Sequence, residues 1–351
     1  MPVRFGVWCG PVAVAVFVIG LLLGGISSSA EEPQFFRIGA AATSGTFFEV
    51  GGLIAAAISK PPGSPLCEQG GSCGVPGLVA VAQATQGSVE NLRMISSGQI
   101  EAGIAQSDIA GWAYAGAGLF AAEGPMTNLR AIASLFPESL QLVVRDDSPI
   151  RNVDDRKGKH VSLGQHGSGT LADARILLAA AGLTENDLSA EYLRPGAAAA
   201  NVKDGTLDGF FLIGGTPVPA IRELAAATAV RLVPVDDKTL ANMREISSAY
   251  RRSVIPAGTY PGVSAETPSI GFNALLIVPA EAADQLIYDI TKALWSEPSR
   301  RLIDARDPIG KQLRLADALD GLTVPLHPGA KRFYREAGLP VDEDGVYGRR
   351  E

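Results

Sequence analysis

The sequence has few residues of the kinds that hold metals or bind nucleotide cofactors. It contains three histidines and three cysteines among 351 residues, and no Cys/His/Asp cluster has metal-ligand spacing. A Gly-Lys-Ser/Thr phosphate loop is absent, and Gly164, Gly167 and Gly169 do not have the spacing of the dinucleotide fingerprint. We therefore expect no metal and no cofactor.

Positive charge is also scarce. The formal net charge is -7 and no long Lys/Arg run occurs, which argues against a nucleic-acid partner. With 46% hydrophobic residues, the chain can bury a sizeable core and is expected to form two domains.

The amino terminus has the layout of a secretory signal. Arg4 precedes an apolar run over residues 12–23, and small residues lead to Ala30. This predicts a signal peptide over residues 1–30, removed after Ala30. A permanent membrane anchor over residues 7–26 is the alternative.

Export would place Cys67 and Cys73 in an oxidising compartment. Five residues separate them in a glycine-rich stretch, and no histidine lies near. We expect a disulfide that closes a surface loop.

Two turns of similar composition lie between a strand and a helix. Residues 161–163 fit a buried strand, Gly167-Ser168-Gly169-Thr170 a turn, and residues 171–181 a helix. Ser44-Gly45-Thr46 stands in the same position after a strand at residues 35–39. Free N–H groups and the helix dipole make such turns receptive to anions, although ordinary helix capping is the alternative.

Strands and helices alternate along most of the chain, so we expect an α/β fold with open, mostly parallel sheets flanked by helices. Strand candidates include residues 129–135 and 140–145. Residues 31–139 plus 279–351 are predicted to form lobe I, and residues 140–278 lobe II. Crossings at 140–145 and 269–278 would form a hinge.

The sequence resembles the TAXI-type extracytoplasmic solute receptors of TRAP transporters. The matching segments, in order, are Ile38-Gly39 with Thr43-Ser44-Gly45-Thr46-Phe47-Phe48, Gly87-Ser88-Val89-Glu90-Asn91, Gln106-Ser107-Asp108, Leu129-Arg130-Ala131, and Gly167-Ser168-Gly169-Thr170. The resemblance runs from about residue 35 to residue 340.

The resemblance implies a two-lobed type II periplasmic-binding-protein fold with a two-crossing hinge. It also implies a non-enzymatic periplasmic receptor that delivers a small organic acid or amino acid, such as glutamate, to a TRAP-type permease. The implied ligand contacts are Ser44, Gly45, Thr46, Phe47, Ser88, Asn91, Gln106, Ser107, Ser168, Gly169, Thr170 and Thr216.

One departure concerns the ligand. Members of the family often carry tyrosine where Phe47 and Phe48 stand, and the missing hydroxyl removes a donor worth about 1.5 to 3 kcal/mol to a charged partner. We therefore expect a less polar acid than glutamate.

Two alternatives use the same cleft. The first is a hydrolase or transferase, for which Ser72 in a nucleophile-elbow pattern and Ser168 beside His166 are the candidates. The second is a solute sensor that docks a membrane kinase. Glu90 and Asp108 could meet a ligand amine, but each lies near a helix start, where stabilising the helix dipole is the favoured role.

Overall fold

The computed structural model describes residues 1–3, 6, 32–247, 249–306 and 308–341. The predicted signal peptide therefore lies almost entirely outside the described residues. The described residues from Glu32 onward form one compact unit, and the description below concerns that unit.

Lobe I starts with strands that alternate with helices, as the apolar runs predict. Its elements are β1 (Gln34–Gly39), α1 (Thr46–Ile58), β2 (Ser59–Lys60), β3 (Val75–Pro76), β4 (Leu78–Gln83), α2 (Ser88–Ser96), β5 (Ala102–Gln106) and α3 (Ser107–Ala115). The helices α8 (Asp284–Leu294), α9 (Glu297–Asp304) and α10 (Pro328–Glu336) return to the same core, to which they contribute Ile287, Ile290, Ile303 and Tyr334.

Lobe II follows the same alternation. Its elements are β7 (His160–Ser162), α4 (Gly169–Ala180), β8 (Ser189–Glu191), α5 (Pro195–Lys203), β9 (Gly209–Gly214), α6 (Pro219–Ala227), β10 (Val230–Val233), α7 (Asp237–Ile246) and β11 (Arg251–Ile255). Separate apolar clusters cover the two faces of its sheet, one around Leu142 and Phe211 and the other around Val143 and Phe210.

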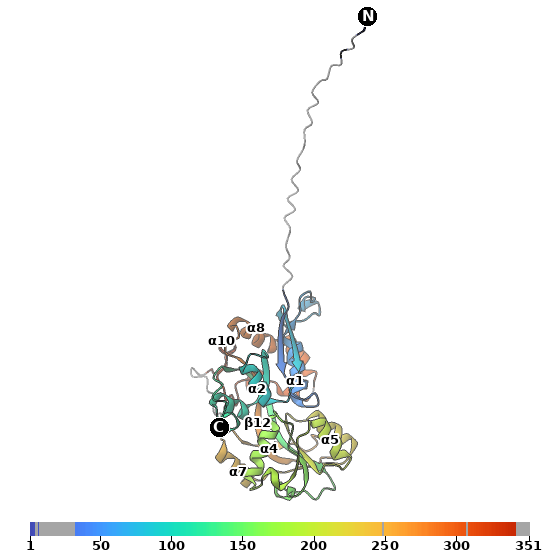
Figure 1. Ribbon diagram of the computed structural model, residues 1–351, viewed down its shortest axis with the longest axis vertical. Coiled ribbons are helices and arrows are strands. Elements are labelled where there is room, and N and C mark those ends of the chain that lie inside the picture. Colours follow the sequence, from blue (N-terminus) through green and yellow to red (C-terminus); the bar gives the residue numbers. More distant parts are fainter. Residues whose placement is uncertain (4–5, 7–31, 248, 307, 342–351) are drawn as a thin grey trace. The chain divides into compact units, whose positions relative to one another are not determined.

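Two long strands join the lobes. They are β6 (Leu129–Arg145) and β12 (Thr267–Pro279), which pair with each other in antiparallel fashion. In Figure 1, α1, α2, α8 and α10 are labelled above β12, in lobe I, and α4, α5 and α7 are labelled below it, in lobe II. The prediction of a two-lobed type II periplasmic-binding-protein fold with two crossings is confirmed.

The sheet corrects one part of that prediction. A single sheet runs through both lobes in the order β4-β1-β5-β12-β6-β9-β7-β8. β1 pairs in parallel with β4 and β5, but β12 is antiparallel to β5 and β6, and β6 is antiparallel to β9. The sheet is therefore mixed, because both crossings enter it against the direction of their neighbours.

The two strands expected at residues 129–135 and 140–145 are one continuous strand. Pro137 lies between the two predicted segments, and proline cannot donate to a strand ladder. In the structure Pro137 lies opposite Asn273 of β12, next to a bulge between Ala274 and Leu275, and is exposed. The predicted lobe boundaries fall within β6 and β12 and stay a prediction.

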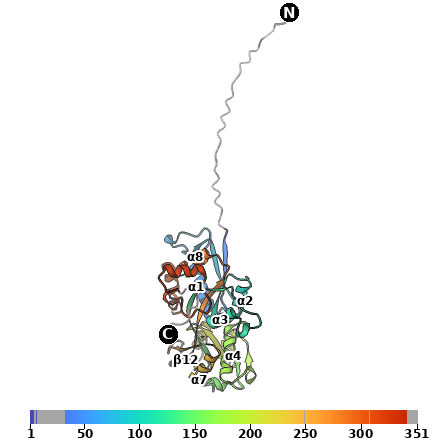
Figure 2. The same ribbon diagram turned by 90° about the vertical axis from the view of Figure 1, so that its left-hand side faces the viewer.

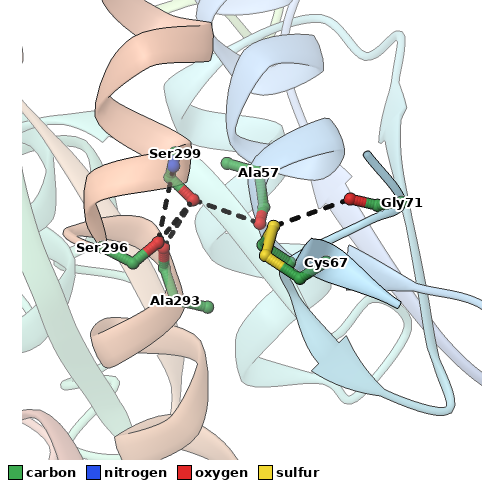
Figure 3. Close-up of a disulfide and its surroundings, with 7 residues drawn as sticks. Ala57, Cys67, Gly71, Ala293, Ser296 and Ser299 are labelled. Carbon is green, nitrogen blue, oxygen red and sulfur yellow. Dashed lines mark hydrogen bonds between the residues drawn. A yellow bond between two sulfur atoms is a disulfide. The ribbon is translucent and has the colours of Figure 1, made fainter. Parts of the chain in front are cut away.

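The predicted disulfide between Cys67 and Cys73 is present, with its Cα atoms 4.8 Å apart. Figure 3 shows it beside the carboxyl end of α1, where Ala57 lies. On the other side of Ala57, the Ser299 hydroxyl of α9 donates to the carbonyls of Ala57 and Ala293, at 3.4 and 2.6 Å. No residue of the loop that the disulfide closes lines either of the cavities described next.

Candidate functional site

A small cavity of about 40 Å³ lies between the two lobes. The segments that follow β1, β4, β7 and β8 contribute to its wall together with residues at the carboxyl ends of β5 and β9, as expected for a site in an α/β sheet. The lining residues are Ala41, Ala42, Gly45, Thr46, Phe47, Gln86, Gly87, Ser88, Gln106, Gln165, Ser168, Gly169, Thr170, Pro195, Leu212 and Ile213.

Five of the described helices begin at this cavity. Thr46 opens α1, Ser88 opens α2, Gln106 is the N-cap of α3, Gly169 opens α4 and Pro195 opens α5. The N-caps of α1, α2, α3 and α5 make no side-chain capping bond, whereas Ser168 accepts from the Leu171 amide. Within the described chain no charged side chain lines the cavity, so its field comes from these helix ends.

The amino ends of α2 and α4 approach each other closely. Gly87 adopts a φ of +127°, and a Cβ built there would lie 3.2 Å from the Ser168 Cα. Glu90 N donates to Gly167 O at 3.1 Å, and Gln165 Nε2 donates to Gln86 O at 2.8 Å. Glycine at position 87 is required both by its φ and by this contact across the lobes.

The other rim of the cavity is closed by the loop before α1. Ser44 Oγ accepts from Gly196 N at 3.1 Å, and Ser44 O accepts from Ala220 N at 3.1 Å. Thr46 Oγ1 donates to Gly215 O at 2.8 Å. Together with the bonds between α2 and α4, these contacts define a closed arrangement of the lobes.

Gln106 forms part of the cavity wall and carries a buried side-chain network. Its Oε1 accepts from the Ser88 hydroxyl at 3.2 Å, while its Nε2 donates to Asp173 Oδ2 of α4 at 2.7 Å. A Cβ built on Gly169 would lie 1.6 Å from Gln106 Oε1. A side chain at position 169 would therefore fit the closed arrangement only if the Gln106 side chain or the lobes moved.

The structure brings most of the predicted site residues together. Those that line the cavity are Gly45, Thr46, Phe47, Ser88, Gln106, Ser168, Gly169 and Thr170. Thr170 also anchors lobe II, because its hydroxyl accepts from Ile213 N at 3.2 Å. Phe47 is buried, with its ring edge-on to Phe136 at 6.2 Å between centroids.

Four predicted contacts do not line the cavity. Ser44 lies at the rim and bonds lobe II, as described above. Asn91 is fully buried, where its Nδ2 donates to Gly39 O and Ile104 O. Ser107 Oγ accepts from Asn273 N, and Thr216 O accepts from Gln312 Nε2. All four have partners within the protein, which a motif in sequence could not reveal.

The residues that sequence reasoning missed fall into two groups. Gln86 and Gln165 directly precede the predicted turns, so the polar signal was present one or two positions outside the chosen segments. Pro195, Leu212 and Ile213 belong to apolar runs that read only as helix and strand, and the fold alone brings them to the cavity.

A larger interlobe cavity of about 660 Å³ adjoins the first one at Ser168. Trp112, Leu119, Leu171 and Ile176 supply apolar walls, and His166 lines this cavity and not the smaller one. The His166 ring stacks on Tyr192 at 4.5 Å.

The serines of the enzyme alternative lie in unsuitable surroundings. Ser72 stands in the disulfide loop, between a 3-10 turn and the short strand β3, and lacks the strand and helix of a nucleophile elbow. The Ser168 hydroxyl donates to Gln165 O at 2.6 Å and accepts from Leu171 N, and its role is that of a helix cap.

The model of a known protein family matches most of this chain. The model of a family described as the NMT1-like family matches residues 38–338. Among the described residues, no helix has the length and apolar character needed to span a membrane.

Solved structures of binding proteins are similar at low identity. The periplasmic aliphatic sulphonate binding protein SsuA from Escherichia coli is 16% identical, over 91% of this chain and 94% of its own, with a TM-score of 0.44. The alkanesulfonate-binding protein SsuA from Xanthomonas axonopodis pv. citri, bound to MOPS, is 18% identical. The match covers 88% of this chain and 95% of that protein, with a TM-score of 0.44. A substrate binding protein of an ABC uptake transporter from Streptococcus pneumoniae, with bound histidine, is 15% identical. The match covers 80% of this chain and 94% of that protein, with a TM-score of 0.46.

Proposed function

Given that the chain belongs to the NMT1-like family, we propose that it is a solute receptor which binds a small organic anion between its two lobes. The receptor acts in the periplasm and hands the solute to a TRAP-type membrane permease. The TAXI-type assignment and the permease rest on the motif resemblance given above.

One observation carries the proposal: five helix amino ends from two lobes converge on one cavity. Each helix end contributes a partial positive charge, and its first N–H groups have no acceptor within the helix, so together the five ends favour a carboxylate or a similar anion. Because the helices belong to different lobes, the anion gains contacts with both lobes only in the closed state. Ligand binding then stabilises closure.

The lining favours a compact and partly apolar acid. Phe47, Leu212, Ile213 and Pro195 line the cavity along with Thr46 and Ser88. At about 40 Å³ the closed cavity is far below the 300 Å³ or more that is usual for drug-sized ligands. A short monocarboxylate fits these walls better than glutamate, whose second charge would find no basic partner there.

A thermal-shift screen of organic acids tests the proposal. Short monocarboxylates, dicarboxylates, glutamate and matched amines are each added to the purified chain. A ligand at 100 times its Kd adds about 2.7 kcal/mol to the folded state. Stabilisation by the monocarboxylates is expected, and stabilisation by amines alone would contradict an anion site.

Two phenylalanine variants refine the screen. Phe47→Tyr restores a hydroxyl at the cavity and is expected to raise affinity for glutamate relative to a monocarboxylate. Phe48→Tyr is the control, because Phe48 does not line the cavity. An equal effect of both variants would argue against Phe47 as a determinant of specificity.

A further inference from the structure

Three carboxyl groups are buried where the lobes meet. Asp108 belongs to α3 of lobe I, Asp173 to α4 of lobe II and Glu138 to the crossing strand β6. Their exposed fractions are 2%, 0% and 1%, respectively. No group of carboxyl, His or Cys side chains that could hold a metal ion occurs among the described residues.

The hydrogen bonds of this carboxyl cluster are incomplete. Asp173 accepts from Tyr250 Oη at 3.0 Å and from Gln106 Nε2 at 2.7 Å. Asp108 lies within hydrogen-bonding reach of Asp173. Both oxygens of Asp108 and both of Glu138 accept no hydrogen bond within the described part of the chain. Two ionised carboxylates cannot bond each other, whereas one proton shared between Asp108 and Asp173 supplies the missing donor.

The basic groups on the helices packed around the cluster are engaged elsewhere. β5, β9 and β12 carry no titratable side chain. Most charged groups on α2, α4 and α7 have partners outside the cluster: Arg93 with Glu123, Arg175 with Glu185, Glu90 with the Gln86 amide, Arg244 with the Tyr250 carbonyl and Asp237 with Arg252. The other two charged groups on α7, Lys238 and Glu245, are exposed. Among the described residues no ion pair is found between a cation and Asp108, Asp173 or Glu138, so neutralising these buried carboxyls requires protons.

The pKa shifts agree with this geometry. Burial raises the pKa of Asp108 to about 6. Burial, reinforced by the charge of Asp108, holds the pKa values of Asp173 and Glu138 well above their usual range. Burial also raises the pKa of Tyr250, whose hydroxyl thus remains a donor to Asp173.

We propose that closure of the two lobes takes up protons at the Asp108, Asp173 and Glu138 cluster. When the lobes separate, Asp173 leaves Gln106 and Asp108, and the aspartates regain water and a pKa of about 3.9. The closed state binds the protons more tightly, so closure is favoured as pH falls and is lost as pH rises through 6 and above. Each proton released changes the closure equilibrium about tenfold per pH unit.

The inference rests on the proposed binding function, but its test needs no ligand. If the chain binds no acid yet closes with proton uptake, the proposed function fails alone. If an acid binds and closure ignores pH, this inference fails alone.

Hydrogen exchange between pH 5 and 8 reports closure directly. The amides of Glu90, Gly196 and Ala220 donate across the lobes, and their protection, corrected for intrinsic exchange, measures the closed state. The amide of Ile54, in the core of lobe I, is the internal reference for global unfolding. Protection of the three interlobe amides should fall at least tenfold from pH 6 to pH 8, with no change at Ile54.

The variants separate the cluster from general charge effects. Asp108→Asn supplies a permanent donor to Asp173 and is expected to flatten the pH dependence. Asp147→Asn removes an exposed carboxylate paired with Arg145, and this variant should retain the pH dependence of the wild type. If low protection of the Ile54 amide shows that the Asp108→Asn variant does not fold, Glu138→Gln is measured in its place. Interlobe protection that is constant with pH in the wild type, or an unchanged pH dependence in the cluster variant, overturns the proposal.

Discussion

Gln106 Nε2 donates a 2.7 Å hydrogen bond to Asp173 Oδ2, and this bond joins the end of β5 in lobe I to α4 in lobe II. The other end of the same amide accepts from Ser88 at the cavity wall. One side chain thus connects the anion cavity to the buried carboxyl cluster. A change in the protonation of Asp173 acts directly on the group that shapes the cavity.

Replacement of Gln106 by methionine should weaken ligand binding with little loss of fold. Gln106→Met keeps the volume but removes the amide donor to Asp173 Oδ2, and leaving a buried acceptor without its hydrogen bond costs about 1 to 3 kcal/mol. Affinity for the acid selected by the thermal-shift screen should fall about tenfold or more in calorimetry. Gln285→Met, an exposed glutamine on α8 that bonds Asp289, is the control. Equal affinity of the two variants would show that the Gln106 bond does not stabilise closure.

Replacement of Gly169 by alanine should prevent closure. The added Cβ would lie 1.6 Å from Gln106 Oε1, a contact that only a shift of the lobes or of Gln106 can relieve. Small-angle scattering should show an open form even with excess ligand, and affinity should fall more than tenfold. The fold should persist, because alanine is favoured over glycine in helices by about 0.5 to 1 kcal/mol.

The matched control for that variant is Gly52→Ala in α1. Gly52 is exposed on its helix, and a Cβ there meets nothing within 4 Å. This variant should gain stability and bind as the wild type does. If Gly169→Ala also binds as the wild type does, the tight contact between α4 and Gln106 is not part of the bound state.

The alternation of apolar runs was enough to predict the two lobes, the order of most elements and the meeting of the two Ser-Gly-Thr turns. The prediction from apolar runs was wrong or incomplete where contacts with distant parts of the chain determine the local structure. The sequence predicts two strands at residues 129–135 and 140–145, yet β6 continues through Pro137 as a single strand, with a register shift in which Leu135 of β6 is the extra residue. Residues 236–255 lack a strong period, and the sequence alone did not predict α7 and β11 there.

The same limit applies to the site. Asn91 and Ser107 share turns with true lining residues, but their side chains satisfy backbone groups of Gly39, Ile104 and Asn273. Asp108 reads as a carboxylate that stabilises the start of α3. Its burial against Asp173 depends on the meeting of two lobes and could not be inferred from spacing.

Variants of two serines that cap helices can distinguish a role in helix capping from a role in ligand binding. Ser168 caps α4 at the cavity, and Ser296 caps α9 far from the cavity lining. Loss of either cap should cost about 1 kcal/mol in chemical denaturation. Only Ser168→Ala should also weaken acid binding, as measured by calorimetry. If both variants bind equally well, the Ser168 hydroxyl serves the helix alone, and any turnover lost with it would need another explanation.

Arg156 should destabilise the fold at neutral pH. It ends a short 3-10 helix in lobe II, is 0% exposed and stacks on Phe211 with 5.1 Å between the guanidinium carbon and the ring centre. None of its three side-chain nitrogens has a hydrogen-bond partner in the described part of the chain. Burial lowers its pKa to about 9, so the folded state binds the proton less tightly than the unfolded state does.

Arg156→Met should therefore stabilise the protein by at least about 1 kcal/mol in urea at pH 7, because an apolar chain of similar length fills the site without desolvating a charge. The advantage should shrink gradually as pH rises from 9 toward 12.5, because the wild-type arginine then loses its proton on folding and that loss costs less at each higher pH. Arg222→Met, at an exposed position on α6, is the control and should stay within about 0.5 kcal/mol of the wild type. A loss of stability in Arg156→Met at pH 7 would mean that the buried guanidinium has an anionic partner which stabilises lobe II.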